Sequence, residues 1–141
     1  GNVYWFQAER ANELYQALDG KQRKVALLEK KSRGERGNKT IETKGTAEGL
    51  DGLPVSDLSR DQKELMSKVL GDLLAPFRKK DADEALKLIK ANDMDKLHLS
   101  YYKNENVGDD EVWDVWQVEG PKMVWYFRGK PHVHVWANIE A

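Results

Sequence analysis

The chain has 141 residues, of which 40% are hydrophobic and 33% are charged, and its formal net charge is -1. This balance is typical of an ordinary globular domain and provides no overall field that would attract nucleic acid or an anionic membrane. The absence of cysteine excludes disulfides, thiolate metal sites and a cysteine nucleophile, and no apolar run is long enough to span a bilayer.

The N-terminal part of the chain is predicted to form two helices. Within residues 2–18, apolar side chains recur at alternating steps of three and four, which is the period of an amphipathic helix. Asp19 and Gln22 have the spacing of a capping box, in which each side chain bonds to the backbone N–H of the other residue. A second helix should therefore follow the turn at Asp19 and continue to about Lys31.

The next region, residues 32–57, is rich in glycine and has little periodicity, so we expect a long loop. A loop of this length in a compact domain is usually functional or disordered. Ser59 repeats the capping-box spacing ahead of a wide apolar stripe, which predicts a third helix that ends just before Pro76. Asp81 is expected to begin a fourth helix that closes near residue 92.

After Asp95 the hydrophobic period changes from about 3.6 to 2, which indicates a change from helix to strand. Short connections between the later strands imply hairpins and therefore antiparallel pairing. The predicted strands are 97–103, 112–118, 122–128 and 132–139. We therefore predict a single α+β domain over residues 1–141, with about four N-terminal helices packed on one face of a C-terminal four-stranded antiparallel sheet.

The last predicted strand contains a His-x-His motif. His132, His134 and Trp136 should share one face, while the aliphatic residues between them face the helices. Two imidazoles spaced about 7 Å apart on a strand can converge on one divalent ion such as zinc or copper. His98 alternates onto the same outer face and is a candidate third ligand if the strand order brings it close. The alternative is that these histidines are ordinary, partly exposed surface residues.

Tryptophan is concentrated in the predicted strands. The commonest role for such residues is core packing, but Trp116, Trp125 and Trp136 could also form a platform for a sugar or another small flat ligand. A locally basic stretch between residues 21 and 44 lacks interleaved aromatic residues, so a solvated surface is a better interpretation than a nucleic-acid site.

Three functional hypotheses follow from these patterns. The first is a ligand-binding or divalent-metal-binding domain that uses His132 and His134 on the outer sheet face. The second is a metal-dependent hydrolase, in which the bound ion would activate water. The third is a structural or partner-docking module with a Trp-rich interface. The residues alone do not decide whether the chain is an enzyme.

Several short motifs, taken in order, resemble the bacterial family catalogued as domain of unknown function 3500. The likeness extends from about Leu14 to Trp136. It implies a longer, exported protein, periplasmic or secreted, whose missing N-terminal region would be a partner of this C-terminal piece, although composition leaves the cytoplasm open. It also places a His-x-His at His132 and His134, but the chain departs from the family pattern after Trp136. The motifs are LDGKQRKVAL from Leu18, LSRDQKELM from Leu58, EGP from Glu119 and HVHVW from His132.

Overall fold

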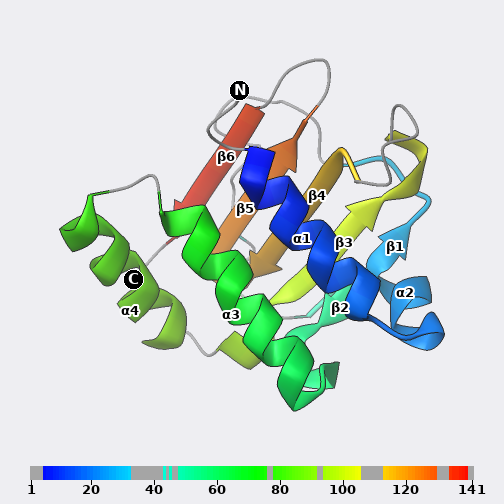
Figure 1. Cartoon of the computed structure of the whole chain (residues 1–141), viewed down its shortest axis with the longest axis horizontal. Coiled ribbons are helices and arrows are strands. Elements are labelled where there is room, and N and C mark those ends of the chain that lie inside the picture. The colour runs from blue at the N-terminus through cyan, green and yellow to red at the C-terminus, as the bar shows by residue number, and fades with distance from the viewer. Residues whose placement is uncertain are drawn as a thin grey trace.

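Four helices and a six-stranded sheet make up the described part of the computed structural model, which confirms the predicted α+β class (Figure 1). The structure describes residues 5–32, 43, 45, 48–75, 78–91, 94–105, 113–129 and 134–139. None of the helices in these ranges is long and apolar enough to cross a membrane. The helices are α1 (Trp5–Ala17), α2 (Gly20–Ala26), α3 (Arg60–Leu74) and α4 (Lys79–Ala91). The strands are β1 (Leu27–Leu28), β2 (Leu53–Pro54), β3 (His98–Tyr102), β4 (Val115–Gly120), β5 (Met123–Arg128) and β6 (His134–Ile139).

The predicted four-stranded antiparallel sheet was incomplete: two short strands join the four expected ones, and the sheet is mixed because one of them runs parallel to its neighbour. Its order is β1-β3-β4-β5-β6, and β2 also pairs with β3. β1 runs parallel to β3 and pairs with Tyr101 and Tyr102, whereas β2 runs antiparallel to β3 and pairs with His98 and Leu99. β1 and β2 therefore lie end to end along the same edge of β3. The predicted second helix is correspondingly shorter and ends at Ala26.

Helices α1 and α3 lie side by side in front of the sheet in Figure 1, and α4 lies beyond α3 near β6. Every second residue of the central strands faces these helices. Trp116 and Phe127, which are directly opposite each other on β4 and β5, stack with ring centroids 5.2 Å apart. Both rings are fully buried in the core between the sheet and the helices.

The two predicted capping boxes are both present, and they also bond to each other. Asp19 caps α2 together with Gln22, and Ser59 caps α3 together with Gln62. The two glutamine amides face each other, and each Nε2 donates to the other Oε1 at 2.8 Å. Each amide also donates to a backbone carbonyl two residues before the other N-cap: Gln22 to that of Asp57, and Gln62 to that of Ala17. This reciprocal pair fixes the starts of α2 and α3 relative to each other.

Tyr101 connects the centre of β3 to α1. Its hydroxyl donates to the backbone carbonyl of Ala11, and its side chain is fully buried. The pKa of Tyr101 is raised far above its ordinary value. The main cause is burial, because the ionised phenolate would lose its hydration, and the nearby Tyr15 raises it further.

This shift predicts a loss of stability at alkaline pH. Below about pH 10 the phenol is protonated in both states, so the stabilisation is fully present. Above about pH 10 the phenol of Tyr101 loses its proton in the unfolded chain but keeps it in the folded chain. The free energy of unfolding should therefore fall by about 1.4 kcal/mol per pH unit. Urea denaturation of the wild type and of Tyr101→Phe over this range measures the difference. Equal slopes in the two proteins would contradict the assignment, because the other tyrosines contribute equally to both.

Candidate functional site

The sheet has a helix-facing side and an outer side, and the predicted alternation in β6 is confirmed. Val135, Ala137 and Ile139 pack against the helix-side core. Trp136 instead packs in a separate cluster on the outer side, together with Tyr126. Residues directly opposite each other on neighbouring strands share a face, so the pairing register shows which side chains lie together on the outer side.

The register separates two of the histidines proposed as metal ligands. His98 is in register with Glu119, then with Val124 and finally with Asn138, four residues away from His134. Three strand spacings across the sheet and four residues along it put His98 and His134 roughly 19 Å apart. Both histidines are on the outer face, as expected, but one ion cannot be bound by both of them.

His132 lies outside the described residues, so its relation to His134 stays a prediction. Within the part of the chain that the structure describes, no group of three His, Asp or Glu side chains is arranged to hold a metal ion. The imidazole of His134 is half-buried and meets the Trp136 ring edge-on, with centroids 5.3 Å apart.

The three tryptophans proposed as a ligand platform do not share a surface. Trp116 and Trp125 belong to the helix-side core, whereas Trp136 is on the outer side. The reason is the alternation of side chains along the strands. Trp116 is opposite Phe127 and Trp125 is opposite Ala137, both on the helix-facing side, while Trp136 is opposite Tyr126 on the outer side. A joint stacking platform or a Trp-rich docking face built from all three is therefore not available on the outer side.

The outer side of the sheet is largely enclosed, although the four described helices pack on the other side. Ser100, Gln117 and Glu119 lie on it with exposures of only 0%, 2% and 3%. The connection between β1 and β2 contacts the outer face through Ser32 and Asp51: Ser32 bonds to Tyr126, and the carbonyl of Asp51 accepts a bond from Ser100. Polar groups are thus enclosed on this side, and burying them costs free energy unless they form hydrogen bonds with the protein or with a ligand.

A group of polar and aromatic side chains gathers at one end of the outer face. We call Ser32, Tyr126, Arg128, His134 and Trp136 the Arg128 cluster. Arg128 Nη2 donates to the Tyr126 hydroxyl at 3.0 Å and to the Ser32 hydroxyl at 3.3 Å, and the two hydroxyls are 2.8 Å apart. His134 is directly opposite Arg128, and Trp136 is directly opposite Tyr126, whose ring it meets edge-on at 5.6 Å.

Comparison with known proteins gives a family but no activity. The family model described as "Protein of unknown function (DUF3500)" matches residues 3–137. The chain belongs to the DUF3500 family. No curated protein and no solved structure matches the chain. The family assignment agrees with the resemblance seen in the sequence motifs, and the function has to be argued from the residues themselves.

Four residues of this DUF3500 chain stand out in the structure, although the sequence patterns did not mark them as site residues: Ser32, Glu119, Tyr126 and Arg128. Arg128 and Tyr126 alternate with buried aromatic residues and so could have been placed on the outer face, but their partner Ser32 comes from a stretch without periodicity. Glu119 lies just beyond the end of the predicted strand 112–118. In the structure β4 continues through Gly120, so Glu119 shares the outer face with Gln117 and is only 3% exposed there.

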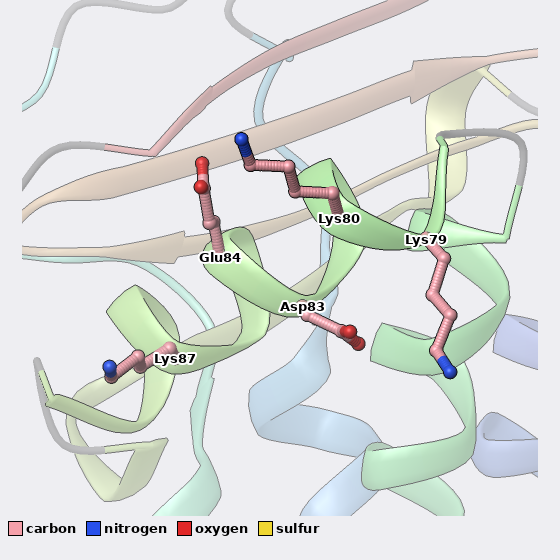
Figure 2. A pocket seen from close by; sticks show the side chains of 5 residues that line it. All are labelled: Lys79, Lys80, Asp83, Glu84 and Lys87. Atoms are coloured by element: carbon pink, nitrogen blue, oxygen red, sulfur yellow. The ribbon is translucent and has the colours of Figure 1, made fainter.

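A shallow hollow on the solvent side of α4 does not form a comparable site. Figure 2 shows Lys80 beside Glu84 and Lys79 near Asp83, with Lys87 further along the helix. Side chains four residues apart on a helix are neighbours, so this arrangement alternates opposite charges along one exposed surface. Such mixed pairs keep a helix soluble and stabilise it slightly, and they present no single charge to a ligand.

Proposed function

We propose that the domain binds a small anionic ligand, such as a carboxylate or phosphate, at the Arg128 cluster. The observation that carries this proposal is the guanidinium of Arg128, which bonds to two hydroxyls and lies directly opposite an imidazole. A guanidinium presents several N–H donors in a planar fork that matches carboxylate and phosphate oxygens. Tyrosine and serine hydroxyls can turn to donate to the same oxygens.

The register partners of Arg128 favour an anion over the divalent cation expected from the His-x-His motif. On the outer face, the cross-strand neighbours of Arg128 are Val115 and His134, neither of which is acidic. A divalent ion at His134 would lie beside the permanent positive charge of Arg128, and like charges repel most strongly where burial lowers the local dielectric. The rings of Tyr126 and Trp136 provide the apolar wall that small-molecule sites usually combine with a few placed polar groups.

Parallel titrations with phosphate, benzoate and zinc, followed by tryptophan fluorescence, test the proposal. Trp136 contacts both Tyr126 and His134, so occupation of the cluster should change its emission, and Trp136→Phe identifies that contribution. Arg128→Leu should weaken binding of the anion at least tenfold, which corresponds to about 1.4 kcal/mol. The matched control is Arg60→Leu, which removes an equal charge from the exposed start of α3 and should leave affinity within twofold.

The possible outcomes separate the competing ideas. Zinc binding that is lost in His134→Ala but retained in Arg128→Leu would replace the anion site with a metal site. Anion binding that falls equally in the Arg128 and Arg60 variants would indicate only general charge attraction. No response to either benzoate or phosphate would remove the proposal.

A further inference from the structure

A cavity of about 210 Å³ lies on the helix-facing side of the sheet, between α4 and the last two strands. Most of its lining is apolar: Leu74 at the end of α3, Ala85 from α4, and Ala137 and Ile139 from β6. Trp125 from β5 adds an indole, and Asp81 is the one ionisable residue among the described residues that line the cavity. This cavity and the Arg128 cluster are on opposite sides of the sheet, so an inference about one does not depend on the other.

Asp81 lies at the edge of the inward side of α4, where it lines the cavity with its side chain 45% exposed. The inward side of α4 is formed by Ala85 and the buried Ile89, which follow Asp81 by four and eight residues. Residues at these spacings share one helix face, so an apolar residue is expected at position 81. The other charged residues of α4 lie around its solvent side, as Figure 2 shows for five of them.

The local interactions of Asp81 do not require it to line the cavity. Its carboxylate bonds to Arg78 Nε at 3.1 Å, but the Arg78 side chain is 88% exposed, and such exposed pairs contribute little to stability. A carboxylate in the first turn is favoured by the helix dipole, but any position of that turn would serve. The carboxylate therefore lines the cavity while its side chain stays 45% exposed, so it can face a bound ligand and solvent at the same time.

We propose that this cavity binds a small organic cation, a protonated alkylamine or a quaternary ammonium ion. The carboxylate of Asp81 would pair with the positive charge, and the aliphatic side chains would enclose the alkyl groups. The indole of Trp125 suits the same class of ligand, because a cation near an aromatic ring is attracted by the negative face of the ring. The volume suits a small ligand, since a cavity of about 150 Å³ can hold benzene and typical drug-sized sites begin at about 300 Å³.

Two probes of nearly equal shape test the role of charge: the tetramethylammonium cation and neutral tert-butanol. The readout is the indole N–H resonance of Trp125 in a two-dimensional NMR spectrum, assigned by its loss in Trp125→Phe. Tetramethylammonium should shift this resonance at millimolar concentration and bind at least tenfold more tightly than tert-butanol. Equal affinity for the two probes, or no shift with either, would overturn the proposal.

Matched variants then locate the interaction. Asp81→Asn keeps the shape of the side chain and should weaken tetramethylammonium binding at least tenfold while leaving tert-butanol unchanged. Asp83→Asn makes the same change on the solvent side of α4 and should affect neither probe. Ala85→Leu should fill the cavity and abolish both shifts. Unaltered cation affinity in Asp81→Asn would show that the carboxylate has no part in binding, and retained tert-butanol binding shows that the variant is folded.

Discussion

Replacing Gly52 with alanine should lower the free energy of unfolding by at least about 3 kcal/mol. Gly52 has a φ of 97°, which residues with a side chain rarely adopt. A Cβ at this position would lie 2.2 Å from Ser100 Oγ and 2.5 Å from the carbonyl oxygen of Leu99. The Ser100 hydroxyl could turn away, but the backbone of Leu99 is fixed by its pairing within the sheet.

Urea denaturation of the variant measures this cost, and Gly71→Ala provides the matched control. Gly71 is on an exposed part of α3 and has open space where its Cβ would be. Alanine is a better helix former than glycine, so this second substitution should stabilise the protein by about 1 kcal/mol. A loss of less than 1 kcal/mol in Gly52→Ala would mean that the chain entering β2 can shift, and that its close approach to β3 is not required.

Gln62→Ala should be the next most harmful substitution, with a loss of about 2 kcal/mol. The side chain caps α3 by accepting from the N–H of Ser59, and it also bonds to Ala17 and Gln22. Thermal unfolding should show a decrease in Tm of about 6 °C for a domain of this size. Gln16→Ala, an exposed position on α1, should change Tm by little.

A double-mutant cycle isolates the contribution of the glutamine pair itself. Gln22→Ala removes the opposite amide, so the double variant should lose less than the sum of the two single losses. We expect a coupling free energy of about 1 kcal/mol, since both substitutions remove the same two hydrogen bonds. Losses that add without coupling would show that each cap acts alone and that the amide pair contributes nothing.

Features set by neighbouring residues could be predicted from the sequence. Both capping boxes depend on a contact between residues three apart, and Asp19 and Ser59 cap their helices as expected. The alternation in β6 likewise placed Trp136 on the outer side and Val135 toward the helices. In each case the information lies within one turn of helix or one length of strand.

Features set by distant partners could not be predicted in this way. Leu27 and Leu28 continue an apolar stretch that reads as helix, and they become strand only because Tyr101 and Tyr102 are available to pair with them. A strand of two residues is too short to show a period of its own. Asp81 was expected to begin α4, whereas the helix starts at Lys79, which turns the Asp81 carboxylate toward the cavity rather than leaving it as a cap.

The candidate site likewise has a part that local sequence patterns predict and a part that depends on distant residues. Strand alternation alone identifies the face that carries Arg128, Tyr126 and His134, because these residues belong to two adjacent strands. Ser32 joins them from almost a hundred positions earlier in the chain, and no pattern around it signals that contact. The separation of His98 from His134 depended on strand order, which local patterns do not contain.

The shared edge of β3 has a consequence for how members of this family could diversify. The chain leaves β1 and returns in β2 at adjacent points of one strand, so both ends of the intervening segment are held by the sheet. Lengthening a segment between fixed ends costs only about 0.6 kcal/mol for each doubling. Residues that contact the outer face from this segment, such as Ser32 and Asp51, can therefore change while the helical layer and its packing remain as they are.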